Sequence, residues 1–209
     1  RVAGAGDVNG DGTPDLLVGA PSYDSAGEPD RGAVWVYSGA DGALVHFIEG
    51  DDQIDFLGYS IAGGADLDQD GFDDFVVGMT GFNGYIGGAR AYSGRTGSVP
   101  YTVTKDNLGW VGGGALAILD DVDGDGTPDW ATPHSNSPDM GVRFLSGSSG
   151  ATLFIAYVPV QGSGSQFGSS MSPMDDVNGD GFADLAVGAA NESYGAIAGG
   201  TVRILSGFD

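Results

Sequence analysis

The stretch DVNGDGTPDLLVG, residues 7–19, places three aspartates, an asparagine and two glycines in nine positions before the chain turns apolar at Leu16. The pattern recurs as DLDQDGFDDFVVG from Asp66, DVDGDGTPDWATP from Asp121 and DVNGDGFADLAVG from Asp176. The copies begin 59, 55 and 55 residues apart. A motif that returns at a nearly fixed interval indicates a repeat architecture, so each copy is interpreted as part of one repeat.

A second block keeps register with the first, about thirty residues downstream. It reads GAVWVYSGADG, GGARAYSGRTG, MGVRFLSGSSG and GTVRILSG, in which β-forming residues run into Ser-Gly. This pattern predicts a strand, a tight hairpin turn and a further strand. The segments ALVHFIEG, SVPYTVT and ATLFIAYVPV then supply the strand after the turn, and no segment has a convincing helical period.

Four short strands per repeat predict an all-β fold, a β-propeller built from four-stranded antiparallel blades. We expect one domain over residues 1–209, with repeats at about 1–50, 51–105, 106–160 and 161–209. The repeats are longer than the roughly 40 to 45 residues of a WD40 blade because they carry the acidic loop and a variable polar stretch. A two-sheet sandwich is the main alternative, but it would not explain why the acidic loop falls at the same point of every repeat.

Within each acidic loop, positions 1, 3, 5 and 9 carry side-chain oxygens, and position 6 is glycine. Calcium takes six to eight oxygen ligands, and glycine allows the tight curl that brings alternate residues around one ion. Position 7 varies, as expected of a residue that offers its backbone carbonyl. We therefore expect about four Ca²⁺ ions, one per loop. The predicted ligands are Asp7, Asn9, Asp11, Thr13 and Asp15; Asp66, Asp68, Asp70, Phe72 and Asp74; Asp121, Asp123, Asp125, Thr127 and Asp129; and Asp176, Asn178, Asp180, Phe182 and Asp184.

The charge balance agrees with this interpretation. The chain carries 29 acidic and 7 basic residues, a formal net charge of -22, and 14 of the acids occupy the predicted ligand positions. Two like charges 4 Å apart repel by about 4 kcal/mol at an effective dielectric constant of 20, which a divalent ion reverses. Solvated Asp-Gly turns that bind nothing remain the alternative, and magnesium is less suitable because it retains its waters.

An EF-hand also begins with this pattern, but it requires a bidentate glutamate at position 12 and flanking helices. Position 12 is Val18, Val77, Thr132 and Val187 in the four copies. Dockerin-type repeats are excluded for the same lack of helices. The loops therefore belong to a different class of calcium site.

The segments FGSSMSPMDDVNGDGFADLAVGAA at 167–190 and FLGYSIAGGADLDQDGFDDFVVGMT at 56–80 resemble the FG-GAP repeats of integrin alpha-subunit β-propellers, and VGAP stands at 18–21. The resemblance covers essentially the whole chain. It implies that the acidic loop joins the first and second strands of a blade and binds calcium. It also implies seven blades, whereas about 3.7 repeats are present, so we expect a partial propeller or one that is completed by association.

The sequence departs from the family pattern at several places. Gly112 stands where the phenylalanine of the third Phe-Gly pair is expected, and Leu57 stands there in the second, with Phe56 one place early. Gly78–Thr80 and Thr132–His134 replace the Gly-Ala-Pro segments of those repeats. These departures concern blade packing and leave the loops unchanged.

Several functional classes are disfavoured by the sequence. The net charge of -22 would repel phosphate backbones, so nucleic acid is not expected as a partner, and no apolar run is long enough to insert in a membrane. There is no cysteine, nucleophile elbow or zinc-binding helix motif, and His46, in a strand, and His134, in a loop, are interpreted as packing or surface residues. We therefore expect no enzyme activity.

The favoured interpretation is an extracellular or cell-surface binding module in which calcium is structural, for adhesion or for another protein or glycan ligand, with self-association as a way to complete the propeller. The alternative is a propeller lectin or a non-catalytic domain of a larger polysaccharide-acting enzyme. Aromatic residues that could stack on sugars are Trp35, Trp110, Trp130, Tyr23, Tyr85 and Tyr194. Trp110 is the best exposed candidate, whereas Trp35 is expected to be core.

Overall fold

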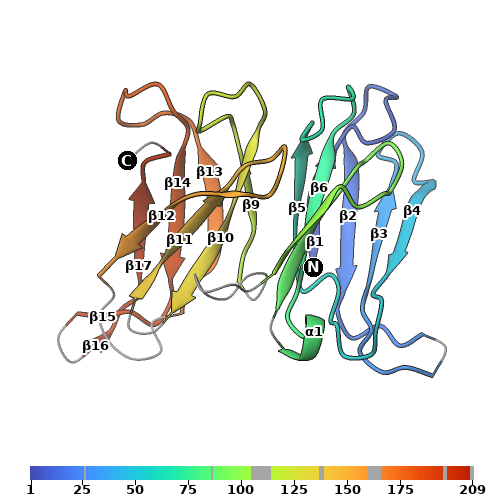
Figure 1. Cartoon of the computed structure of the whole chain (residues 1–209), viewed down its shortest axis with the longest axis horizontal. Coiled ribbons are helices and arrows are strands. Elements are labelled where there is room, and N and C mark those ends of the chain that lie inside the picture. Colours follow the sequence, from blue (N-terminus) through green and yellow to red (C-terminus); the bar gives the residue numbers. More distant parts are fainter. Residues whose placement is uncertain are drawn as a thin grey trace.

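The computed structural model describes residues 1–25, 27–85, 87–104, 114–136, 139–159, 166–194 and 197–207 (Figure 1). In this part of the chain, four antiparallel sheets of three or four strands stand side by side, accompanied by a two-stranded sheet and by one four-residue helix, α1 (Phe82–Tyr85). The all-β prediction and the blade-like sheets are confirmed. Among the described residues no helix has the length and apolarity to cross a membrane.

Each sheet, which we call a blade, uses strands that follow one another along the chain. Blade 1 contains β1 (Val2–Gly6), β2 (Asp15–Ala20), β3 (Ala33–Tyr37) and β4 (Leu44–Glu49). Blade 2 contains β5 (Ser60–Ala65), β6 (Asp74–Met79), β7 (Gly88–Tyr92) and β8 (Tyr101–Thr104). Blade 3 contains β9 (Ala117–Leu119), β10 (Asp129–Asn136), β11 (Asp139–Leu145) and β12 (Thr152–Val158).

Blade 4 contains β13 (Phe167–Met174), β14 (Asp184–Ala189) and β17 (Thr201–Leu205) within the described residues. A short hairpin of β15 (Ser193–Tyr194) and β16 (Ile197–Ala198) lies between β14 and β17. The strands that follow the Ser-Gly turns in the first three blades are β4, β8 and β12, as the sequence predicts.

The hydrophobic core consists of three layers, one between each pair of neighbouring blades. Val34 and Val36 of blade 1 pack with Phe75 and Val77 of blade 2. Trp130 and Leu145 of blade 3 pack against blade 2, and Phe144 packs with Leu185 and Val187 of blade 4 in the third layer. Strands bury alternate side chains on opposite faces, so each inner blade contributes to two layers.

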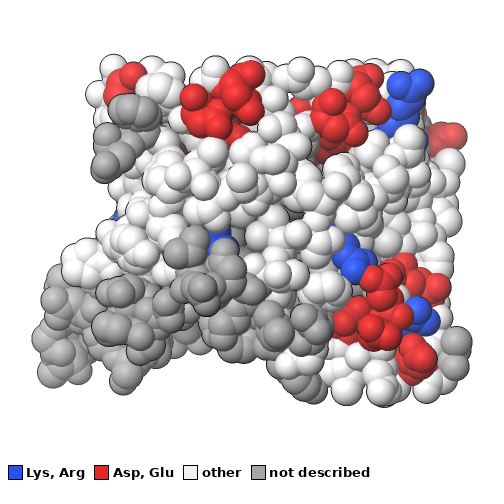
Figure 2. All heavy atoms as spheres, in the orientation of Figure 1, with Lys and Arg blue, Asp and Glu red and all other residues white. Residues whose placement is uncertain are grey.

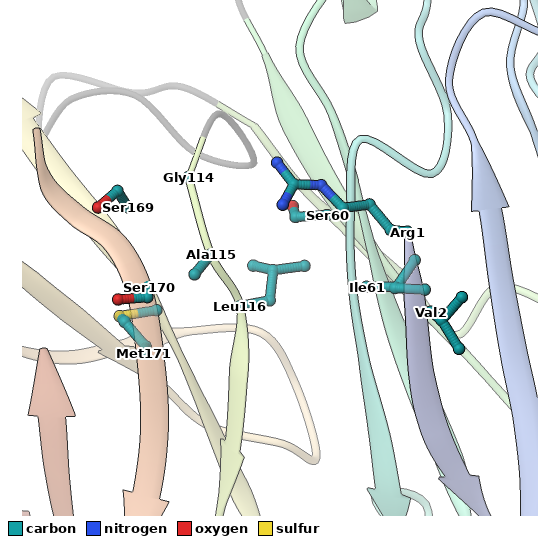
Figure 3. Close-up of a pocket in the computed structure, with 10 residues that line it drawn as sticks. All are labelled: Arg1, Val2, Ser60, Ile61, Gly114, Ala115, Leu116, Ser169, Ser170 and Met171. Atoms are coloured by element: carbon teal, nitrogen blue, oxygen red, sulfur yellow. The ribbon is translucent and has the colours of Figure 1, made fainter. Parts of the chain in front are cut away.

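The first strands of the blades, β1, β5, β9 and β13, are neighbours in that order. Residues of β1, β5 and β13, with the residues that precede β9, line a cavity of about 240 Å³ that includes Ser60, Leu116 and Ser170 (Figure 3). Arg1 also lines it and is its one ionisable side chain, so this described lining offers no acid–base pair.

One strand differs from the sequence prediction. The sequence predicts His134 in a loop, but β10 continues to Asn136 and His134 is buried. The continuation is possible because Thr132 and Pro133 pair with Arg143 and Val142 of β11. Beyond Ala131 the strand has no pairing with β9, so the missing N–H of Pro133 interrupts no ladder on that side.

Candidate metal centres

The four acidic segments form loops between the first and second strands of the blades. We name them loop 1 (7–15), loop 2 (66–74), loop 3 (121–129) and loop 4 (176–184). All four lie at the upper edge in Figure 1, and Figure 2 shows acidic side chains gathered along that edge. The repeat therefore places its acidic motifs in a row on one side of the molecule.

Each loop folds around the carboxylate of its first aspartate. In loop 1, Asp7 Oδ1 accepts the N–H of Gly10 at 2.7 Å, and Asp7 Oδ2 accepts the N–H of Gly12 at 2.8 Å. Glycine is needed at this second contact because the residue at position 6 has φ of +85°, in the left-handed region. The position 1 to position 6 contact, at 2.8 Å in every case, recurs in the pairs Asp66 and Gly71, Asp121 and Gly126, and Asp176 and Gly181.

The last aspartate of each loop is buried. The exposed fractions are 3%, 1%, 0% and 1% for Asp15, Asp74, Asp129 and Asp184. Asp74 Oδ2 accepts the N–H of Leu67 at 2.8 Å, and Asp74 Oδ1 accepts the N–H of Gly94 at 2.7 Å. The same two contacts recur at Asp15 and Asp129. This aspartate therefore ties the start of the loop to the end of the third strand.

The Ser-Gly turn after the third strand is part of the site, which sequence reasoning interpreted only as a hairpin turn. Ser38 Oγ donates to Asp11 Oδ2 at 3.2 Å, and Ser206 Oγ donates to Asp180 Oδ2 at 2.8 Å. A Cβ on Gly94 would lie 1.8 Å from the backbone oxygen of Asp73, so only glycine fits there. The recurrence of Ser-Gly 25 to 31 residues after the first aspartate of every acidic loop was the signal that could have revealed this role.

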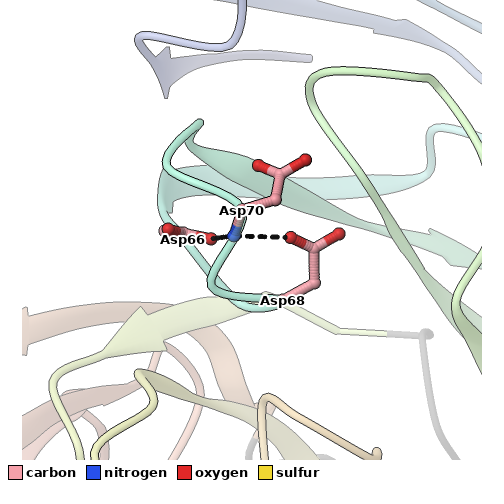
Figure 4. Close-up of side chains that lie close together, drawn as sticks. All are labelled: Asp66, Asp68 and Asp70. Carbon is pink, nitrogen blue, oxygen red and sulfur yellow. Dashed lines mark hydrogen bonds between the residues drawn. The ribbon is translucent and has the colours of Figure 1, made fainter.

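The loop carboxylates converge as a cation requires. Ligand oxygens of Asp66, Asp68 and Asp70 all lie within 4.8 Å of one another (Figure 4). Two oxygens on opposite sides of a calcium ion lie about 5 Å apart, because each Ca–O distance is about 2.3 to 2.6 Å. Loop 3 meets the same criterion through Asp121, Asp123 and Asp129. The residues present therefore fit Ca²⁺.

In loop 4, a buried carboxylate oxygen supplies a separate observation that fits a bound cation. Asp184 Oδ1 is buried and has no hydrogen-bond partner, whereas the matching oxygen of Asp74 accepts an N–H. A buried carboxylate oxygen without a partner is costly unless a donor or a cation satisfies it. The donor set of the loops, carboxylate and carbonyl oxygens, is the set that Ca²⁺ prefers.

Burial and hydrogen bonding shift the pKa values of individual loop carboxylates in opposite directions. Burial raises the pKa of Asp74 and of Asp129 to about 6, although the backbone N–H donors of Gly94 and Val122, among others, oppose the increase. The pKa of Asp180 is lowered because its carboxylate accepts hydrogen bonds from the Phe182 N–H and from the side chains of Asn178 and Ser206. Without a cation, Asp74 and Asp129 thus retain their protons to a higher pH than Asp180 does.

The aromatic residues predicted to stack on sugars differ in how far the structure buries them. Trp130 is wrong as a stacking residue, because its side chain is fully buried between blades 2 and 3 and its indole N–H donates to the Tyr101 hydroxyl at 3.1 Å. Trp35 is half-buried, with ring centroids 5.3 Å from Tyr23 and 5.2 Å from Phe47. Trp110 and the side chains of Tyr85 and Tyr194 lie outside the described residues.

The two histidines do not form a site together. His46 lies in β4, as predicted, and its Nε2 hydrogen-bonds the backbone oxygen of Gly94. His134 lies in blade 3, where its ring meets the edge of Tyr157 at a centroid distance of 5.4 Å. The packing role predicted for both side chains agrees with these contacts.

The model of the FG-GAP repeat matches residues 1–37, 57–99 and 167–205, which is more than half of the chain. The chain belongs to the FG-GAP repeat family. The matched residues include loops 1, 2 and 4. The third repeat, which departs from the Phe-Gly and Gly-Ala-Pro patterns, lies outside the matched residues although it forms a four-stranded blade.

Integrin alpha subunits are among the relatives of this FG-GAP chain. Integrin alpha-6 of Gallus gallus is 39% identical over 82 residues, which are 37% of this chain and 7% of the integrin. Integrin alpha-4 of Xenopus laevis is 34% identical over 139 residues, 61% of this chain and 13% of the integrin. The chain thus spans only a small part of the length of these relatives.

Among solved structures, the rhamnogalacturonan lyase YesW superposes with a TM-score of 0.61 and 16% identity, over 97% of this FG-GAP chain and 49% of the lyase. A Bacillus licheniformis rhamnogalacturonan lyase gives a TM-score of 0.57 and 16% identity, over 88% of this chain and 40% of that chain. At this identity the likeness concerns the fold alone.

Proposed function

We propose that the chain is a calcium-stabilised ligand-binding module that acts outside the cell or at its surface. The observation that carries the proposal is the convergence of the Asp66, Asp68 and Asp70 carboxylates within 4.8 Å. Membership of the FG-GAP family and the integrin relatives support a role in adhesion or ligand binding. Calcium is abundant outside cells, where weak sites of this class are filled.

In this proposal calcium has a structural role. Each bound ion neutralises carboxylates that would otherwise repel one another, and so holds the turn between the first and second strands. The rigid blades then carry the loops between the second and third strands, residues 21–25, 27–32 and 80–85, at the opposite edge (Figure 1). Loops positioned by a rigid scaffold are where binding surfaces are usually found.

The chain itself is proposed to be non-catalytic. The loop carboxylates are explained by calcium and by backbone hydrogen bonds, and the histidines lie apart in blades 1 and 3. The likeness to two rhamnogalacturonan lyases concerns the fold alone, so it names no catalytic residue in this chain.

A glycan is the second candidate ligand, and one observation favours it. Tyr23, Trp35 and Phe47 form an aromatic group on blade 1, with Phe47 43% exposed. Their strands turn Val34, Val36 and Ile48 toward blade 2, so Trp35 and Phe47 lie on the other face. Exposed aromatic rings provide surfaces on which sugar rings stack.

The proposal is tested by measuring binding of the chain to immobilised extracellular-matrix proteins and to a glycan array, in calcium and in chelator. We expect saturable binding to a protein ligand that is lost in chelator and restored by calcium. Binding to glycans that Phe47→Ala abolishes would assign the second function instead. Turnover of a polysaccharide panel, or equal binding with and without calcium, would overturn the proposal.

We further propose that two copies of the chain associate through the outer faces of blades 1 and 4. Val202 and Ile204 of β17 are 73% and 56% exposed, and Leu16 and Phe47 on the outer face of blade 1 are 41% and 43% exposed. The opposite faces of these blades form the interblade core, so the same kind of apolar sheet face is available to another blade. Exposed apolar faces of this kind mark association surfaces.

Sedimentation equilibrium tests this association. We expect particles larger than one chain, and we expect Val202→Asp to dissociate them because a charge would be buried between the faces. Val99→Asp is the matched control, since Val99 is 40% exposed but belongs to blade 2, in the segment between β7 and β8. A single-chain mass at all concentrations would contradict the proposal.

A further inference from the structure

Loops 1 and 2 are joined by direct contacts across the boundary between blades. Asp73 Oδ2 accepts the N–H of Asp7 at 2.8 Å, and the Asp73 N–H donates to the backbone oxygen of Asp7 at 3.1 Å. The ring of Phe72 lies over Gly10 so closely that a Cβ there would be 2.6 Å from the ring. Arg95 in turn lies 4.9 Å from the Phe72 ring centroid. A residue of loop 2 thus fixes the first ligand position of loop 1.

Loops 2 and 3 are joined by a different residue at the equivalent place. The side-chain amide of Gln69 donates to the backbone oxygen of Gly126 at 3.2 Å and to Thr127 Oγ1 at 2.9 Å. Gln69 has φ of +60°, in the left-handed region, where the other three loops have Gly10, Gly124 and Gly179. A side chain in this conformation is unfavourable relative to glycine, so the contact to loop 3 offsets a local cost.

The three boundaries can be compared because position 4 of one loop faces position 7 of the next. At the first boundary Gly10 meets Phe72, and at the second Gln69 bonds Thr127. At the third, a Cβ on Gly124 would meet no atom within 4 Å. Loop 4 has Ala183 where loop 2 has Asp73, so the carboxylate that accepts the Asp7 N–H at the first boundary has no counterpart at the third.

These contacts connect the residues that the ions would order. Asp7 and Thr127, each held by loop 2, are themselves predicted ligands of loops 1 and 3. An ion in loop 2 orders the backbone of residues 66–74 and, through Asp73 and Gln69, part of each neighbouring loop. The next ion then needs to order less of the chain, which raises its affinity.

We propose that loops 1, 2 and 3 bind calcium as one cooperative group, coupled through Asp73 and Gln69, while loop 4 binds independently. This inference rests on the calcium binding proposed above. Filling of loop 2 is expected to raise the affinity of loops 1 and 3 by about fivefold or more, which is the usual range of coupling between sites.

The test is a calorimetric titration of chelator-stripped protein with Ca²⁺ alone. We expect a cooperative phase with a Hill coefficient above unity and a separate independent site. Gln69→Gly, which installs the residue found in the other loops, and Asp73→Ala, which installs the residue found in loop 4, should each reduce the cooperativity without abolishing binding. Gln53→Gly is the matched control, because Gln53 is exposed and lies outside all four loops.

A second measurement does not depend on these two variants. Asp68→Asn with Asp70→Asn removes two carboxylates of loop 2, and hydrogen exchange then reports the amides of the remaining loops during the titration. We expect the amides of loops 1 and 3 to need a calcium concentration at least about fivefold higher for the same protection from exchange as in the original protein. The concentration that protects the amides of loop 4 should not change. If the original protein binds calcium at independent sites, and Gln69→Gly does not change this binding, the coupling is overturned but the proposed function is not. If the protein binds no calcium at all, both the proposed function and the coupling are overturned.

Discussion

Calcium is expected to raise the melting temperature of chelator-stripped protein by about 12 to 24 °C. A site that is filled to ten times its dissociation constant stabilises the folded state by about 1.4 kcal/mol, so four such sites contribute about 6 kcal/mol. For a chain of this length, 1 kcal/mol corresponds to about 2 to 4 °C. Differential scanning calorimetry in chelator and in increasing calcium measures the change, and a melting temperature that stays constant would contradict the prediction.

The melting temperature in chelator is also expected to depend on pH, and the sign of this dependence follows from the pKa values of two buried carboxylates. The pKa of Asp74 and of Asp129 is about 6 in the folded protein, against 3.8 for an ordinary aspartate. Between these values the folded state binds more protons than the unfolded state, so in chelator stability falls as pH rises from 4 to 6. Lowering the pH from 7 to 5 should therefore raise the melting temperature in chelator.

In calcium the dependence on pH is expected to reverse, because protons compete with the ion for the same carboxylates. The increase in melting temperature that calcium produces should be smaller at pH 5 than at pH 7. Asp52→Asn serves as the control for charge alone, since Asp52 is exposed and lies outside the four loops. It should leave the calcium-dependent increase unchanged, whereas Asp70→Asn should reduce it.

Asp129→Ala is expected to cost about 3 to 5 kcal/mol of unfolding free energy even in chelator. The Asp129 carboxylate is fully buried and accepts the N–H of Val122 at 2.8 Å and that of Gly147 at 2.9 Å. Its removal leaves two backbone donors without partners, and each buried unsatisfied donor costs about 1 to 3 kcal/mol. Urea unfolding of the chelator-stripped protein measures the loss.

Asp125→Ala, in the same loop, provides the comparison. Asp125 is exposed, and its carboxylate accepts the N–H of Thr127 and the hydroxyl of Ser148. Solvent replaces these contacts, so we expect a loss below about 1 kcal/mol in chelator. The variant should instead lose part of the stabilisation by calcium. Equal losses for Asp125→Ala and Asp129→Ala in chelator would show that the buried carboxylate has no separate structural role.

The prediction of the blades succeeded where a pattern repeats in register with itself. The acidic loop, the strand after it and the Ser-Gly turn recur at nearly constant intervals from one repeat to the next. A copy with an unusual sequence can therefore be assigned from the position of the other copies. The same redundancy identified loop 3, although Thr132–His134 departs from the family pattern. The prediction of His134 in a loop was wrong, because pairing with β11 extends β10 through this residue.

The different roles of the acidic positions within each loop were not predictable from the sequence. The sequence predicts a metal ligand at position 9, as at positions 1, 3 and 5. In the structure the side chain at position 9 is buried and joins the loop to the Ser-Gly turn. The turn lies about twenty residues away, and only pairing of the second and third strands brings the two together. The position of Trp130 has the same origin, since its burial depends on the neighbouring blade 2.

The sequence by itself determined the repeats, their strands and the oxygen-rich loops, because spacing and residue type act locally and are repeated four times. Only the tertiary structure decided which neighbouring loops touch. Gln69 and Asp73 look like ordinary variations within one motif, and their contacts with Thr127 and Asp7 arise because blade packing brings loops more than fifty residues apart within hydrogen-bonding distance. Contacts between repeats depend on the packing angle of whole blades, which no local pattern encodes.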